Sequence, residues 1–139
     1  GQESYNSLIP MYSRNSDIVL ITFDLTDQST FIELNKWIKI VKDNNPDSKI
    51  ILVGNKCDLK IFRKIDKEQV IELTKNKFIQ NVYYIETSAI SGFNIKELFN
   101  KIFELSLGII KQENIENLEN KINKLENDTK EKYGCCNVQ

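Results

Sequence analysis

Two short polar segments, each directly after an apolar run, carry the side chains best suited to chemistry. Asn55, Lys56 and Asp58 follow one run, and Ser88 and Ala89 follow another. A carboxylate such as Asp58 can accept two parallel hydrogen bonds, and guanine offers two donors side by side, N1–H and its exocyclic amine. Adenine has an acceptor at N1 and no amine beside it, so the carboxylate would stay unpaired. Such a mismatch discriminates between the two bases by about a thousandfold or more.

The neighbouring residues suit the same role. The amide of Asn55 has a donor and an acceptor, so it can hold a base edge and brace its own loop. Lys56 has a long apolar stem that can lie along a base plane. At Ser88 and Ala89 a small residue lets a backbone N–H approach the guanine carbonyl. The alternative is a polar turn in which Asn55 and Asp58 only cap a helix. Because T-S-A ends the next predicted strand, we favour a base-binding site.

Strands and helices alternate three times along the chain. Near-continuous apolar runs predict buried strands at residues 17–24, 49–54 and 81–87. Apolar residues spaced three and four apart predict helices at residues 29–41, 67–78 and 95–110. We therefore predict an α/β fold with a doubly wound, mostly parallel sheet and helices on both faces. In such sheets ligands bind outside the carboxyl ends of the strands, so the two polar segments should meet at one crevice.

Composition excludes several classes of protein. The 139 residues suit one ordinary domain, and 40% are hydrophobic, enough for a core. A net charge of −1 indicates no basic face for nucleic acid. We find no signal peptide and no apolar run long enough to span a membrane. Three cysteines without any histidine form no zinc site and are typical of a reducing compartment.

The motifs together resemble one family. V-G-N-K-C-D-L and E-T-S-A resemble the guanine-recognition motifs of Ras-like small GTPases, and the initial G-Q-E resembles the end of their D-T-A-G-Q-E switch segment. The stretch S-L-I-P-M-Y-S-R-N-S-D-I-V-L-I-T-F-D-L-T-D-Q-S-T-F, followed by K-W-I, is similar to the Rab branch, most of all to Rabs of the Golgi. The resemblance covers residues 1 to about 107.

The resemblance implies a domain, an activity and a set of partners. Residues 1–110 would be the C-terminal part of a small P-loop G domain, and residues 111–139 a flexible hypervariable tail. The activity would be GTP hydrolysis in a molecular switch for vesicle-mediated traffic. The switch would act on the cytosolic face of Golgi or endosomal membranes and cycle with the cytosol. Its ligands would be GTP or GDP with Mg²⁺, and its partners an exchange factor, a GTPase-activating protein, a prenyl-carrying escort and effectors.

The resemblance also gives roles to the first residues. Gln2 matches the catalytic glutamine that orients the attacking water, and Gly1 matches the glycine whose N–H meets the γ-phosphate. Residues 3–13 match the mobile switch that is ordered by GTP. Ile90 departs from the family, which usually has a lysine there whose stem covers the nucleotide; without that cation we expect weaker binding.

A second departure concerns the phosphates. No G-x-x-x-x-G-K-[ST] sequence occurs in the chain. We expect the phosphate loop, the Mg²⁺ ligands and the strand that pairs with residues 17–24 to precede Gly1 in a longer protein. We expect residues 1–139 alone to be unstable and inactive. One alternative is a truncated, non-hydrolysing interaction module. Another is a dinucleotide binder, which would need a G-x-G-x-x-G that the chain lacks.

The last residues, C-C-N-V-Q, form the other informative segment. Cys136 is fourth from the end, as in a C-a-a-X box, and Cys135 beside it resembles the doubly geranylgeranylated Rab tail. Five lysines face six acids after residue 110, so no basic patch assists membrane binding. Two lipids therefore suit stable anchoring better than one. Two unmodified thiols are the alternative. An apolar stripe in the tail, too short to establish a coiled coil, is open to two interpretations: a solvated tail or a partner-binding face.

Overall fold

The computed structural model describes residues 9–75 and 81–108, with side chains from residue 11 onwards. The elements are α1 (Ile9–Ser13), β1 (Ile18–Asp24), α2 (Gln28–Ile32), α3 (Leu34–Asn44), β2 (Lys49–Asn55), the 3₁₀ helix η2 (Lys60–Phe62), α4 (Lys67–Thr74) and β3 (Val82–Glu86). A further helix covers residues 95–108. The chain divides into two compact units, Gly1–Leu105 and Ser106–Gln139. The predicted domain boundary at residue 110 stays a prediction.

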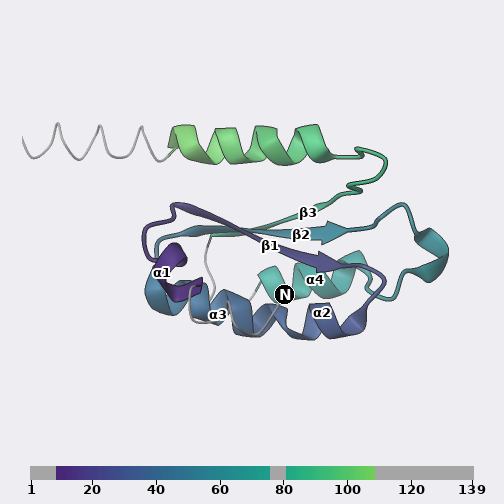
Figure 1. The fold of residues 1–139 in the computed structure, drawn as a ribbon, viewed down its shortest axis with the longest axis horizontal. Coiled ribbons are helices and arrows are strands. Elements are labelled where there is room, and N and C mark those ends of the chain that lie inside the picture. The colour runs from purple at the N-terminus through teal and green to yellow at the C-terminus, as the bar shows by residue number, and fades with distance from the viewer. Residues whose placement is uncertain (1–8, 76–80, 109–139) are drawn as a thin grey trace, which may run out of the picture. The chain divides into compact units, whose positions relative to one another are not determined.

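The three described strands form one parallel sheet in the order β1-β2-β3 (Figure 1). The register pairs Asp24 with Asn55 and Gly54 with Glu86, so all three strands end at the same edge. The parallel α/β fold predicted from the alternating runs is therefore confirmed. The same register brings the segments that follow β2 and β3 together.

Strand β2 is the centre of the core. Its side chains alternate between the two faces, and residues 50 to 53 are all at most 4% exposed. Ile50 and Leu52 join a cluster with Leu34, Ile38 and Val41 of α3 on the face that α2, α3 and α4 cover (Figure 1). Ile51 and Val53 on the opposite face pack against Leu98 and Leu105. Helices on both faces, as predicted, explain why the run has no polar residue.

The segment predicted as one helix over residues 29–41 forms two, α2 and α3, separated at Glu33. The Asp27 carboxylate caps α2 by accepting from the N–H of Ser29 at 3.0 Å. The Thr30 hydroxyl oxygen also accepts from the N–H of Asp24 at 3.0 Å, which fixes the first turn to the end of β1. Glu33 keeps helical backbone angles, so the interruption is local. α3 then continues to Asn44, three residues beyond the prediction.

The other helices begin where the sequence predicts them. A capping box of Asp66 and Gln69 starts α4. The described helix continues to Thr74, and residues 76–78 of the predicted helix lie outside the described part. Residues 109–110 of the last predicted helix lie outside it as well. The loop predicted at residues 56–66 contains η2, a short turn that the apolar pattern did not indicate.

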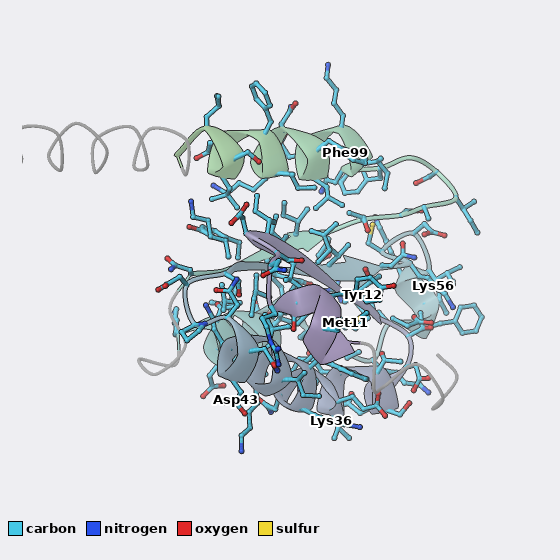
Figure 2. All side chains as sticks on the ribbon, turned by 60° about the vertical axis from the view of Figure 1, so that its left-hand side comes forward. Met11, Tyr12, Lys36, Asp43, Lys56 and Phe99 are labelled. Carbon is cyan, nitrogen blue, oxygen red and sulfur yellow. The ribbon has the colours of Figure 1, made fainter. Side chains whose placement is uncertain are left out.

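Some apolar side chains of β1 and of the last described helix are exposed in the described part of the chain. There β1 pairs with β2 only, and Leu20 on β1 is 44% exposed. Phe99 and Phe103, one turn apart on the helix over residues 95–108, are 64% and 66% exposed (Figure 2 labels Phe99). Within residues 9–75 and 81–108, no helix has the length and apolarity to cross a membrane.

Candidate functional site

The segments that follow β2 and β3 are joined by hydrogen bonds. The Asn55 side-chain oxygen accepts from the N–H of Ala89 at 3.1 Å. The Cys57 N–H donates to the Thr87 carbonyl at 3.1 Å, and the Thr87 N–H donates to the Gly54 carbonyl at 2.8 Å. Asn55 therefore braces the loop as predicted. The two polar segments meet at the strand ends.

Asp58 is exposed in the loop between β2 and α4. Its carboxylate makes no hydrogen bond or ion pair with any residue in the described part of the chain, so both oxygens are open to a ligand. Asp58 also lines a cavity of about 570 Å³, together with Arg63, Glu86 and Phe93. Asn55 and Ala89 do not line that cavity. A base held by Asp58 and the Ala89 turn would therefore lie at the exposed strand ends rather than inside it.

Lys56 connects the site to the end of β1. Its backbone has a φ of 65°, the left-handed region that non-glycine residues rarely adopt. Its ammonium group lies 2.5 Å from the Asp24 carboxylate, and this hydrogen bond raises the pKa of Lys56. Burial acts to raise the pKa of Asp24, but hydrogen bonds from Lys56 and Thr26 lower it overall. Both groups are thus charged at neutral pH, and all three strand ends contribute to the site.

The backbone N–H groups in the turn after β3 differ in whether they already have a partner. Ser88 is fully buried; its N–H donates to the Phe93 carbonyl and its hydroxyl oxygen accepts from Ser91, both at 3.1 Å. The Ala89 N–H already donates to Asn55. Ile90 is 90% exposed, and its N–H donates to no residue in the described ranges. Ser88 therefore supports the turn, and Ile90 presents the available N–H.

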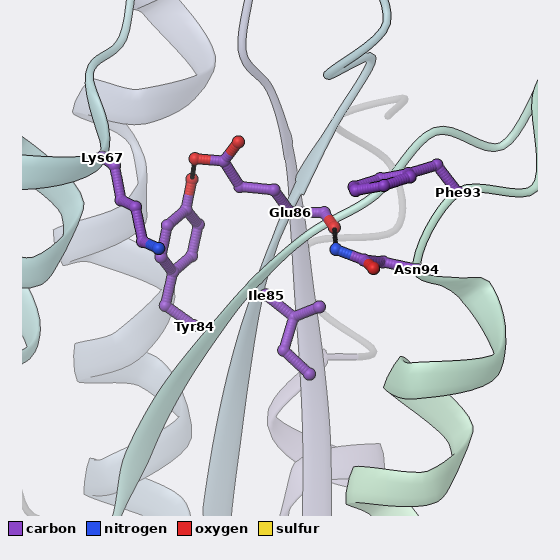
Figure 3. Close-up of a pocket in the computed structure, with 6 residues that line it drawn as sticks. All are labelled: Lys67, Tyr84, Ile85, Glu86, Phe93 and Asn94. Atoms are coloured by element: carbon purple, nitrogen blue, oxygen red, sulfur yellow. Dashed lines mark hydrogen bonds between the residues drawn. The ribbon is translucent and has the colours of Figure 1, made fainter.

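Sequence analysis missed a polar cluster beside these segments. Arg63 donates two hydrogen bonds to the Glu86 carboxylate, at 2.9 and 2.7 Å. The Tyr84 hydroxyl donates to the same carboxylate at 2.8 Å (Figure 3). Hydrogen bonding from Arg63 holds the pKa of Glu86 below its ordinary value. The signal in the sequence was weak: Glu86 ends β3, but Arg63 lies well after β2, in the loop that follows η2.

Two small residues allow close packing under the site. Cys57 packs against the core, and burial raises the pKa of its thiol, so it acts as an apolar residue here. Gly54 leaves little room for a side chain: a Cβ atom would lie 3.0 Å from the Tyr84 hydroxyl and 3.1 Å from Leu25, so these neighbours would have to shift. The strand can therefore lie directly against Tyr84.

Several predicted site residues lie outside the described residues: Gly1, Gln2, Cys135 and Cys136. Within residues 9–75 and 81–108, no three acidic, cysteine or histidine side chains gather to hold a metal ion. The expectation that the Mg²⁺ ligands precede Gly1 stays a prediction. At the carboxyl ends of the strands, the described residues provide the exposed carboxylate of Asp58, the hydrogen-bonded amide of Asn55 and the backbone N–H of Ile90.

Comparison with known families agrees with this geometry. The model of the Ras family matches residues 1–107 of the 139. Proteins of that family are small GTPases, which generally bind GTP and GDP with Mg²⁺ and act with regulators and effectors. The parallel sheet with helices on both faces is consistent with a Ras-like P-loop GTPase domain. The chain belongs to the Ras family of small GTPases.

Proposed function

We propose that this small GTPase is of the Rab type and acts as a molecular switch in vesicle-mediated membrane traffic. Its place would be the cytosolic face of Golgi or endosomal membranes, with cycling through the cytosol. Support comes from the stretch around β1 and α2, which resembles the Rab branch, and from the paired cysteines at the end. The corresponding partners are an exchange factor, a GTPase-activating protein, a prenyl-carrying escort and effectors.

The observation that carries nucleotide recognition is the unpartnered carboxylate of Asp58 beside a braced turn. In our proposal Asp58 accepts from N1–H and the exocyclic amine of guanine. The base carbonyl accepts from the Ile90 N–H, or from the Ala89 N–H once the base displaces the Asn55 oxygen. The Lys56 stem lies along one face of the base, while its ammonium group stays with Asp24. The N1–H, the exocyclic amine and the carbonyl of guanine then each have a hydrogen-bond partner. Adenine would leave the Asp58 carboxylate unpaired.

Titration of the full-length native protein with GDP and with ADP tests the base assignment. We expect GDP to bind about a thousandfold or more tightly than ADP, because adenine leaves the Asp58 carboxylate without donors. Isothermal titration calorimetry measures both affinities under one set of conditions. The two nucleotides share their sugar and phosphates, so the difference reports the base alone. Equal affinities would refute guanine recognition.

Hydrolysis in this proposal uses residues that the structure does not describe. Gln2 would orient the attacking water, and the Gly1 N–H would meet the γ-phosphate, as their matches in the family do. Residues 3–13 would be ordered by GTP and relax after hydrolysis, which releases effectors. The described residues contribute the base site, which sets the identity of the nucleotide rather than the rate of the reaction.

We further propose that Cys135 and Cys136 both carry a geranylgeranyl group. One lipid chain gives only marginal membrane binding, and the acidic balance of the tail adds no electrostatic attraction to anionic lipids. Intact-mass spectrometry of the native protein, followed by fragmentation of its C-terminal peptide, should therefore find two geranylgeranyl groups. A single farnesyl group on Cys136 would overturn the proposal.

A further inference from the structure

The ion pair of Arg63 and Glu86 joins the two segments that carry the proposed base site. Arg63 lies in the loop after β2, five residues beyond Asp58. Glu86 ends β3, immediately before Thr87. Their hydrogen bonds of 2.9 and 2.7 Å are parallel and use both carboxylate oxygens. A bidentate pair of this kind fixes the relative orientation of its two groups as well as their distance.

Further hydrogen bonds hold the pair in one arrangement. The Tyr84 hydroxyl donates to Glu86, and the Glu86 carbonyl accepts from the Asn94 amide at 2.9 Å (Figure 3). The Arg63 Nε–H donates to the Ile65 carbonyl at 2.8 Å. The side chains of Arg63 and Glu86 are only 26% and 19% exposed. Solvent and salt therefore screen this pair less than they screen an ordinary surface pair.

The loop that carries Asp58 has an anchor on each side of it. Before Asp58, the Cys57 N–H donates to Thr87; after it, Arg63 binds Glu86. The Asp58 carboxylate makes no hydrogen bond or ion pair in the described ranges, so the anchors of its loop determine where it lies. The N–H groups of Lys64 and Ile65 also donate to the Leu25 carbonyl, and Arg63 adds a side-chain anchor that is closer to Asp58. Releasing the second anchor would give the loop more conformations, and binding a base would then cost the entropy of ordering it again.

We propose that Arg63 and Glu86 are positioning residues for guanine recognition. They fix the distance between the Asp58 loop and the Ala89 turn, so that one guanine base can contact both at once. Neither side chain touches the nucleotide; Tyr84 assists by holding Glu86. This inference rests on the proposed function, because it needs a guanine base at Asp58.

Inosine diphosphate separates positioning from general stability. It lacks the exocyclic amine of guanine, so the ratio of GDP to IDP affinity measures how well Asp58 is placed. We expect the full-length native protein to prefer GDP by about tenfold or more, the usual effect of a hydrogen bond to a charged group. Arg63→Gln should lower GDP affinity by about tenfold and bring the ratio close to one. Tyr84→Phe removes one hydroxyl and should give an intermediate ratio.

A matched control and a second variant keep the test decisive. Lys101→Gln makes a similar change in the Lys101–Glu104 pair, which has a 3.1 Å contact and a carboxylate that is 69% exposed, and it should leave the ratio unchanged. If Arg63→Gln fails to fold, the Tyr84→Phe ratio decides. A variant that loses GDP and IDP affinity equally, or loses neither, overturns the positioning role. Equal binding of GDP and ADP by the unaltered protein would instead refute the proposed function.

Discussion

Asp58→Asn is expected to lower GDP affinity by about a thousandfold and to turn the base preference toward xanthine. The Asp58 carboxylate only accepts hydrogen bonds, and guanine presents two donors to it. An asparagine amide would place its own donor against the exocyclic amine of guanine, leaving both unpaired. Xanthine has a carbonyl in place of that amine, so the asparagine amide can donate to it while its oxygen accepts from N1–H.

Competition between GDP and xanthosine diphosphate for binding to the full-length protein measures this change in base preference. Asp43→Asn provides the matched control, because Asp43 is exposed on α3 and lies outside the proposed site (Figure 2). That variant should keep the unaltered preference. Guanine affinity that survives in Asp58→Asn would show that another group contacts the edge of the base that carries the exocyclic amine.

The 139-residue chain, expressed alone, is expected to self-associate and to give no GTP turnover above background. Strand β1 has one partner in the described part of the chain, and no described strand pairs with the N–H and C=O groups along its other edge, which is seven residues long. Leu20 on the same strand, with Phe99 and Phe103 on the last helix, leaves apolar surface in water. Catalysis would fail for a separate reason, because the chain has no glycine-rich loop to bind phosphates.

Analytical ultracentrifugation and a phosphate-release assay test the two parts separately. Leu20→Lys, which places a charge on β1, should raise the monomer fraction. Ile61→Lys makes a comparable change at η2, where Ile61 is 93% exposed, and should not. A monomeric chain that unfolds cooperatively and releases phosphate faster than background would contradict the expectation.

The architecture was predictable because the core depends on simple periodicity. The run at β2 is buried on both faces, and such runs indicate a covered parallel strand. The interruption at Glu33 was not predictable from apolar spacing, since spacing stays in phase through it. The start of α2 is fixed instead by hydrogen bonds of Asp27 and Thr30 with Asp24 at the end of β1, which apolar periodicity does not describe.

The meeting of the two polar segments was predictable, but the hydrogen bonds between them were not. N-K-C-D and T-S-A identified the two segments, and the parallel sheet required them to meet. The sequence could not show that Asn55 occupies the Ala89 N–H, or that Ile90 offers the next one. The pairing of Arg63 with Glu86 also escaped notice, because each residue alone resembles an ordinary surface charge. Arg63 and Glu86 are 23 positions apart in the sequence, and only the folded structure brings them together.

Gly54 gives this domain a vulnerable position that a view of nucleotide contacts alone would overlook. Even one methyl group there would press on the Tyr84 hydroxyl, at 3.0 Å. That hydroxyl donates a hydrogen bond to Glu86, and Arg63 donates to the same carboxylate. A shift of Tyr84 would therefore also change the position of the Asp58 loop, which Arg63 anchors. An inherited alanine at this codon would therefore mimic a defect in ligand selectivity, and natural variation should be sparser here than at many surface positions facing the nucleotide.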